Sequence, residues 1–382
     1  MRTRVDPVRS ILRQPAVPSI LPPPPARPSL PTISQLERPY RCPDQPDGVT
    51  EAVHLARLAA GDDRCYGCPH RPASDDRPEP LVRFNSEGQP RGRFRRELTP
   101  DHVAAWIDTL GHRLAVAAAG TDSRPRLAFA QDDRIASAQL AGLIERAARH
   151  GVDAIDLGTT TRPVLEHGVR QLGAAAGLML TAGDLGPGWA GLDVLDAAGQ
   201  PQQLPSTVRT LTPAAARDWS PQPRASRTTQ PVRTFDAAVG YRDRLLAETG
   251  LETPGRPVTL AVAGGNGPVR ELARDLLAAA GIGLGRVRDG GFDAGIRLGR
   301  DGRSLEVIDQ DARPVAAVLL AKTLAPLWRP EGADRRVRCD DRDRLIFQTA
   351  DRSTRDGLLS MLLVAARLRR DDCPASIALR SN

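Results

Sequence analysis

Three cysteines and a histidine near the N-terminus have the residue types and spacing of a metal site. Cys65 and Cys68 form a C-x-x-C pair, and Cys42 precedes them in the chain. Two thiolates at this spacing can bind one tetrahedral Zn²⁺ ion, with Cys42 as the third ligand. We predict that His54, on a short helix, or His70, directly behind the pair, supplies the fourth ligand.

The predicted zinc ion would have a structural role. A segment as small as residues 40–80 buries little apolar surface without a cross-link, and a bound metal supplies one. Free surface thiols, a redox-active pair and an iron–sulfur cluster are the alternatives for the same cysteines. Cys339 and Cys373 have no C-x-x-C partner and are interpreted as ordinary thiols.

A second stretch that could carry chemistry is the glycine-rich turn within residues 178–199. Apolar runs on both sides of it predict a strand, an exposed loop and a second strand. Gly183, Gly186 and Gly188 allow the backbone to adopt positive φ and to approach a ligand closely. The alternative is a tight connector that needs its glycines for geometry alone.

This loop resembles the signature of the α-D-phosphohexomutases, the family of phosphoglucomutase and phosphomannomutase. Residues 181–186, T-A-G-D-L-G, match the family's T-A-S-H-N-P, and residues 190–193 match its N-G-L-K. The family's serine, which carries the transferred phosphate, falls on Gly183, and glycine has no hydroxyl to phosphorylate. Asp184 is a weak substitute, because a carboxylate can also accept phosphate.

Two further motifs keep the family's frame. Residues 84–100 resemble the opening F-G-T-x-G-x-R-G and L-T-P, and residues 131–137 resemble G-R-D-x-R-x-S-S. The resemblance places Arg91 near a phosphate site, and it makes Arg91, Thr181 and Arg134 the candidate ligand-binding residues. The alternative for Arg91 is a surface position in an arginine-rich chain.

Residues 292–310 resemble the family's metal-binding stretch, in which three aspartates of D-G-D-G-D hold Mg²⁺. Their places fall here on Gly299, Asp301 and Arg303. A single carboxylate beside a guanidinium is a poor site for a hard cation, which takes oxygen ligands. We therefore predict that Mg²⁺ does not bind at this loop. A glycine-rich turn at 264–267 could present backbone donors to a phosphate, or be purely structural.

Strand runs alternating with helical periodicity predict the order β-α-β-α-β-β over residues 81–200. One continuous helix is expected through Leu140, Leu143 and Ala147, ending near Gly151. The fold class is therefore α/β: phosphohexomutase-like α/β/α domains with mixed sheets, plus a small Cys-rich N-terminal module. The predicted divisions are a Pro-rich disordered tail at 1–39, the Cys-rich knuckle at 40–80, domain I at 81–200, a linker at 201–232, domain II at 233–330 and a remnant of domain III at 331–382.

The charge of the chain does not predict a nucleic-acid partner. The formal net charge is +7, but Lys322 is the only lysine and the arginines are interspersed with Asp and Glu. Few aromatic residues are available to stack bases. No apolar run has the length of a membrane helix, and the N-terminus lacks a secretory core, so a soluble cytoplasmic protein is expected.

The replaced residues favour a phosphohexomutase-like protein of carbohydrate metabolism that is catalytically inactive and acts by sugar-phosphate binding or regulation. Phosphoryl transfer needs an acceptor nucleophile, a charge-neutralising metal and a clamp on the substrate phosphate. The first alternative is a residual or altered hexose-phosphate phosphotransferase. The second is a zinc-containing scaffold whose N-terminal region binds a protein partner.

Overall fold

The structure is a computed structural model that describes residues 48–50, 53–54, 56–57, 82–121, 123–186, 188–205, 231–252, 255–286, 291–330, 334–371 and 373–379. Cys42, Cys65, Cys68 and His70 lie outside these ranges, so the zinc site stays a prediction. His54 lies within them, on helical backbone, and is 3% exposed. The chain divides into a unit of residues 1–56 and a unit of residues 57–382, which holds every element described below.

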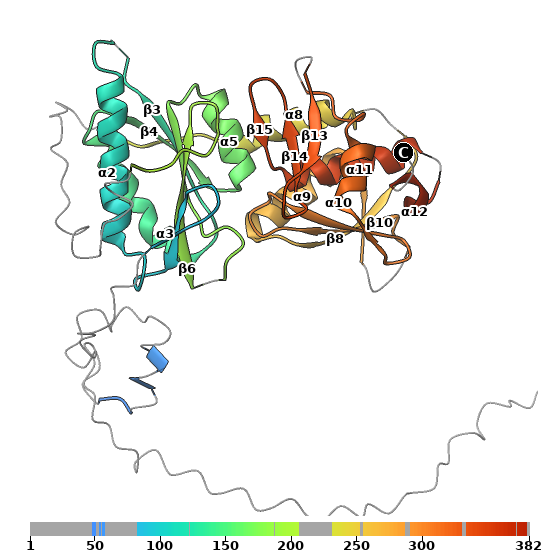
Figure 1. The fold of residues 1–382 in the computed structure, drawn as a ribbon, viewed down its shortest axis with the longest axis horizontal. Helices are drawn as coiled ribbons and strands as arrows, with labels where there is room; N and C mark the ends of the chain where they lie inside the picture. Colours follow the sequence, from blue (N-terminus) through green and yellow to red (C-terminus); the bar gives the residue numbers. More distant parts are fainter. Residues whose placement is uncertain are drawn as a thin grey trace, which may run out of the picture. The chain divides into compact units, whose positions relative to one another are not determined.

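The first lobe, residues 83–205 with the short strand at 233–234, is built on a mixed sheet (Figure 1). In the described part of the chain its strand order is β1-β2-β6-β5-β3-β4-β7. Strands β5, β3, β4 and β7 pair in parallel, whereas the pairs β5–β6, β6–β2 and β2–β1 are antiparallel. The strands are β1 (Arg83–Phe84), β2 (Pro90–Arg93), β3 (Arg126–Gln131), β4 (Asp153–Thr159), β5 (Ala176–Leu180), β6 (Trp189–Asp196) and β7 (Arg233–Thr234).

Helices cover both faces of this sheet, and the side chains of β3 show why. Leu127 and Phe129 join one buried cluster with α2 (Pro100–Ala117) and α3 (Ile135–Ala141), while Ala128 and Ala130 join another with α5 (Arg162–Gln171). Alternate residues of a strand point to opposite faces, so a strand that is apolar throughout must be covered twice. The predicted β-α-β-α-β-β order matches the elements from β3 to β6, but β1, β2 and α2 precede them within residues 81–200. The α/β class is confirmed.

The predicted continuous helix after β3 is wrong in one respect. It is divided into α3, a 3₁₀ turn (Gly142–Ile144) and α4 (Glu145–Ala148). The interruption begins at Gly142, which has a low helix propensity because its backbone loses the most freedom in a helix. Gly151 adopts φ 78°, as expected of a glycine after a helix end.

The second lobe, residues 237–379, contains a five-stranded sheet of order β12-β11-β10-β8-β9 and a three-stranded sheet β13-β14-β15 in its described residues (Figure 1). Helix α11, which is buried along most of its length, joins both sheets in one apolar cluster. The elements are α8 (Ala237–Thr249), β8 (Thr259–Gly264), α9 (Gly267–Ala279), β9 (Gly283–Gly285), β10 (Ala294–Leu298), β11 (Leu305–Asp309), β12 (Pro314–Val315), α10 (Ala317–Leu324), β13 (Arg336–Cys339), β14 (Leu345–Gln348), β15 (Ser353–Thr354), α11 (Gly357–Arg370) and α12 (Ala375–Ala378).

Two features of the fold position the site. The parallel strands β3, β4 and β5 end at the same edge of the first sheet, so the loops after residues 131, 159 and 180 begin side by side. Backbone hydrogen bonds join these loops. The amide of Asp132 donates to the carbonyl of Leu180 at 3.0 Å, and the amide of Thr160 donates to the carbonyl of Gln131 at 2.9 Å. No helix in the described part of the chain is long and apolar enough to cross a membrane.

His167 lies on α5 where it meets α8, edge-on to the ring of Tyr241 with the ring centroids 6.0 Å apart. Burial, together with the positive charges of Arg244 and Arg170, lowers the pKa of His167 from 6.5 to about 4. The unfolded chain therefore binds a proton between pH 6.5 and 4 that the folded chain does not. The free energy of unfolding must fall as the pH is lowered through this window.

We expect this one residue to contribute about 1–2 kcal/mol to the loss of stability between pH 7 and pH 4.5, after allowance for its partial exposure. Urea unfolding of the wild type and H167Q at both pH values measures the contribution. The variant should lose less stability on acidification than the wild type. Equal losses would show that His167 is not held neutral in the folded chain.

Candidate active-site crevice

The loop after β5 is shaped by two of the predicted ligand-binding residues. The hydroxyl of Thr181 accepts a hydrogen bond from the amide of Gly183 at 2.9 Å. Nη2 of Arg134 donates to the carbonyls of Gly183 and Leu185 at 2.6 and 2.8 Å, and its Nε lies 3.2 Å from Asp132. Both side chains hold the loop in its conformation.

Gly183 lies at the point where the predicted site residues come together. It adopts φ 61°, and a Cβ built on it would lie 3.7 Å from Oδ2 of Asp301 and 3.9 Å from Nη2 of Arg91. The structure thus brings the position of the family's phosphorylated serine beside Arg91 and beside the loop predicted to have lost its metal ligands. Asp184 is exposed on the same turn and accepts from the amide of Arg300 at 3.0 Å.

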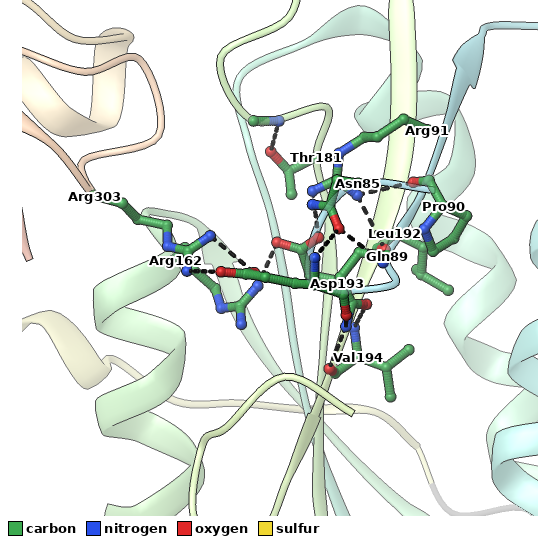
Figure 2. Close-up of polar contacts among 12 residues, drawn as sticks. Asn85, Gln89, Pro90, Arg91, Arg162, Thr181, Leu192, Asp193, Val194 and Arg303 are labelled. Atoms are coloured by element: carbon green, nitrogen blue, oxygen red, sulfur yellow. Dashed lines mark hydrogen bonds and ion pairs between the residues drawn. The ribbon is translucent and has the colours of Figure 1, made fainter. Parts of the chain in front are cut away.

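Arg91 is occupied by a buried carboxylate. Its guanidinium donates to Asp193 and to the carbonyls of Pro90 and Leu192, at 2.8 and 3.2 Å for the two carbonyls. Arg162, which is fully buried, donates to the other oxygen of Asp193 (Figure 2). Burial by itself would raise the pKa of Asp193, but the two guanidinium groups outweigh it and lower that pKa below 3.8.

The Arg162–Asp193 pair was missed by the sequence analysis. Residues 156–163 resemble the family's D-L-G-x-x-x-T-P, with Arg162 in the place of the threonine, and Asp193 stands where the resemblance placed the lysine of N-G-L-K. A new positive charge in one motif and a reversed charge in another were the signal that could have found the pair. Arg162 also forms an ion pair with Glu166, in which Nε and Oε1 are 3.1 Å apart. The other oxygen of Glu166 accepts from the hydroxyl of Thr354 in the second lobe at 2.7 Å.

Arg303 pairs with a carboxylate of the first lobe. Its Nη1 donates to Oε2 of Glu87, on the turn between β1 and β2, at 3.1 Å, and its Nη2 donates to Oε1. Arg355 donates to Glu87 as well. Burial opposes the charge on Glu87, but Arg303 outweighs burial and lowers the pKa of Glu87 below 4.5. A guanidinium therefore occupies a place where the resemblance expects a metal ligand.

Asp301 is the one carboxylate left at the predicted metal positions. It accepts from the amide of Arg303 at 3.0 Å, and burial and the nearby charge of Asp184 raise its pKa above 3.8. Among the residues that the structure describes, no group of three His, Cys, Asp or Glu side chains could hold a metal ion.

A cleft of about 710 Å³ opens beside these loops. Arg297 lies 3.7 Å from Glu306, and Arg344 lies 2.8 Å from Asp340. Arg300 and Arg342 make no ion pair with the residues that the structure describes. The remaining polar groups are two carboxylates, a hydroxyl and backbone. The lining residues are Asp184, Gly264, Gly265, Arg297, Leu298, Gly299, Arg300, Ser304, Leu305, Glu306, Arg342, Asp343 and Arg344.

The glycine-rich turn before α9 contributes backbone to this cleft at Gly264 and Gly265. Asn266 caps the helix by accepting from the amide of Val269 at 3.0 Å. The amide of Gly267 donates to Asp133 of the first lobe at 2.9 Å, so this donor is already used by a carboxylate of the chain.

Comparison with known proteins agrees with the fold. The model of the phosphoglucomutase/phosphomannomutase alpha/beta/alpha domain I family matches residues 83–212. No curated protein matches the sequence.

Solved structures are similar over most of the chain. A phosphoglucomutase/phosphomannomutase family protein from Burkholderia thailandensis has a TM-score of 0.60 at 16% identity, covering 78% of this chain and 80% of its own. A "putative phosphomannomutase" from Thermus thermophilus has a TM-score of 0.59 at 17% identity, covering 78% of this chain and 82% of its own. At this identity the likeness shows the shared fold.

The positive φ of Gly183 generates a stability prediction. A Cβ at this position meets only ordinary van der Waals contacts, so G183S should cost backbone strain without a clash, about 1–2 kcal/mol. G186S is a matched control in the same loop, because Gly186 has no positive φ and the nearest atom to its Cβ lies 4.0 Å away. Urea unfolding of both variants measures the difference, and a G183S protein as stable as G186S would contradict the strained backbone.

Proposed function

Because the chain is a phosphohexomutase-like protein, we propose that it binds a phosphorylated sugar in the cleft described above and does not carry out the mutase reaction. The observation that carries this proposal is the environment of Gly183. The motif resemblance assigns this position to the family's phosphate acceptor, and Arg91, Asp301 and their ion-pair partners lie around it.

The lack of a hydroxyl at residue 183 is the first support for inactivity. A mutase passes a phosphoryl group between an enzyme hydroxyl and the sugar, so the acceptor oxygen must lie in the crevice. The neighbouring Thr181 is only 2% exposed, and its hydroxyl accepts from the Gly183 amide. Asp184 remains the substitute, and an acid-labile phosphate found on it by mass spectrometry would establish the alternative of an altered phosphotransferase.

The charge arrangement is the second support. A divalent cation would neutralise the transferred phosphate, but here arginines neutralise the carboxylates. Arg303 forms an ion pair with Glu87, and Arg91 and Arg162 both form ion pairs with Asp193. A cation placed near Asp301 would meet the guanidinium groups of Arg91 and Arg303, which repel it. We propose that Mg²⁺ is not a cofactor of this chain.

The cleft lining supports a ligand with both phosphate and hydroxyl groups. Arg300 is partly buried and Arg342 is exposed, and their guanidinium groups have donors to offer a phosphate. Asp184 and Asp343 line the same cleft, and carboxylates accept hydrogen bonds from sugar hydroxyls. The names of the related structures, phosphoglucomutase and phosphomannomutase, suggest glucose and mannose phosphates as the first ligands to test.

Titration calorimetry with glucose 1-phosphate and mannose 1-phosphate tests the proposal. We expect the wild type to bind at least one of them and R300A/R342A to bind at least about tenfold more weakly, because charge-assisted hydrogen bonds contribute about 1.5–3 kcal/mol each. R113A, an exposed arginine on α2, is the matched control and should bind like the wild type. The wild type should form no 6-phosphate when Mg²⁺ and a sugar bisphosphate are supplied.

Three results would overturn the proposal. If the wild type bound neither sugar phosphate, the proposed ligand class would be wrong. Steady conversion of the 1-phosphate to the 6-phosphate would show a working mutase. Equal affinity of the wild type and R300A/R342A would show that the ligand binds elsewhere.

A further inference from the structure

We infer that Glu87 is a positioning residue that connects the two lobes. It fixes the arginine wall of the cleft, which consists of Arg297, Arg300, Arg342 and Arg344, without itself lining the cleft. The inference rests on the proposed function only for its ligand-binding measurement. The connection runs from Glu87 through Arg355 and Asp340 to Arg342 and Arg344, which do line the cleft.

The connection begins on a preorganised turn. The side-chain oxygen of Asn85 accepts from the amides of Glu87 and Gln89 at 3.0 and 2.9 Å, and Gly88 adopts φ 73°. An Asn side chain that accepts from the backbone two residues on forms a local turn and stabilises it. The Glu87 carboxylate is thus presented to the second lobe by a turn that is already ordered.

Glu87 contacts two separate segments of the second lobe. Arg303 lies on the loop between β10 and β11, and Arg355 follows β15. The side chains of Glu87 and Arg303 are only 11% and 9% exposed, so water screens their attraction less than it screens a surface pair. Arg303 binds Glu87 through a bidentate pair of hydrogen bonds, which fixes the orientation of the two side chains as well as their distance.

Asp340 carries the connection to the cleft. Its Oδ2 lies 3.0 Å from Nε of Arg355 in an ion pair, and it accepts a hydrogen bond from Nε of Arg344 at 2.8 Å. Its Oδ1 accepts from the amides of Arg342 and Arg344, both at 2.9 Å. Asp340 therefore orders the turn between β13 and β14, and this turn supplies two of the four arginines that line the cleft.

Positioning and simple electrostatics predict opposite effects of removing Glu87. By Coulomb's law, loss of a negative charge near a cleft should strengthen the binding of an anion. If Glu87 positions the arginine wall, its removal frees Arg355 and loosens Asp340, so anion binding should weaken. The sign of the change in affinity separates the two explanations.

The test compares E87Q with the wild type in two measurements. Hydrogen exchange of the full chain without ligand should become faster at residues 340–344 and 300–304 in E87Q. Calorimetry with glucose 1-phosphate should show affinity lower by at least about fivefold, the small end of couplings between distant groups. E271Q, an exposed glutamate on α9, is the matched control and should change neither quantity.

A second variant keeps the test decisive if E87Q folds poorly. R355Q cuts the same connection from the other lobe and should reproduce both effects, and E87Q/R355Q should be no worse than the more affected single variant. Unchanged exchange at 340–344 in the folded variants, or tighter binding, would overturn the inference. If the wild type binds no sugar phosphate, the proposed function fails, and the exchange measurement alone then decides the role of Glu87.

Discussion

The structure depends on the neutralisation of one buried carboxylate, that of Asp193. Removing a carboxylate from water costs several kcal/mol, and only well-placed partners compensate for it. Here Arg91 from β2 and Arg162 from α5 bind its two oxygens, so Asp193 ties the antiparallel edge of the first sheet to a helix on its face. Loss of either arginine would leave one oxygen of the buried carboxylate without its partner, and breaking a buried ion pair typically costs about 3–5 kcal/mol.

The same principle extends through the crevice and reaches the second lobe. Glu166 joins Arg162 to Thr354, and Glu87 joins Arg303 and Arg355. Arg162 and Glu166 both lie on α5, but Glu166 continues to Thr354 and Glu87 pairs with two arginines of the second lobe, so the network connects the lobes as well as balancing charge. In the proposed account, these arginines do the neutralising that a divalent cation would do in a phosphoryl-transfer site.

Much of the fold could be predicted because its signals are local. The apolar runs of β3 and β5, the capping residues Thr99 and Pro100 and the glycine after α4 each act within a few residues. The interruption at Gly142 was missed because a single glycine inside an apolar helical pattern is usually tolerated. Gly142 is exposed and has open space around it, so no tertiary contact at this position offsets its low helix propensity.

The sequence predicts which candidate residues lie close together, but it does not predict which residues they bind. Motif resemblance brought Gly183, Arg91 and the loop at Arg303 to one crevice, and the structure places them there. It did not show that Arg134 and Thr181 bind the loop's own backbone, or that Glu87 is the partner of Arg303. Such pairings join residues far apart in the chain, and they follow from tertiary packing that one sequence does not display.

The most direct test of the central claim is electron paramagnetic resonance with Mn²⁺, a hard cation that prefers the oxygen ligands of a magnesium site. If arginines have replaced the metal, the free-ion signal should be the same with the wild-type protein as with buffer. A stoichiometric loss of that signal, restored by D301N, would show that the crevice binds a divalent cation and would contradict the account.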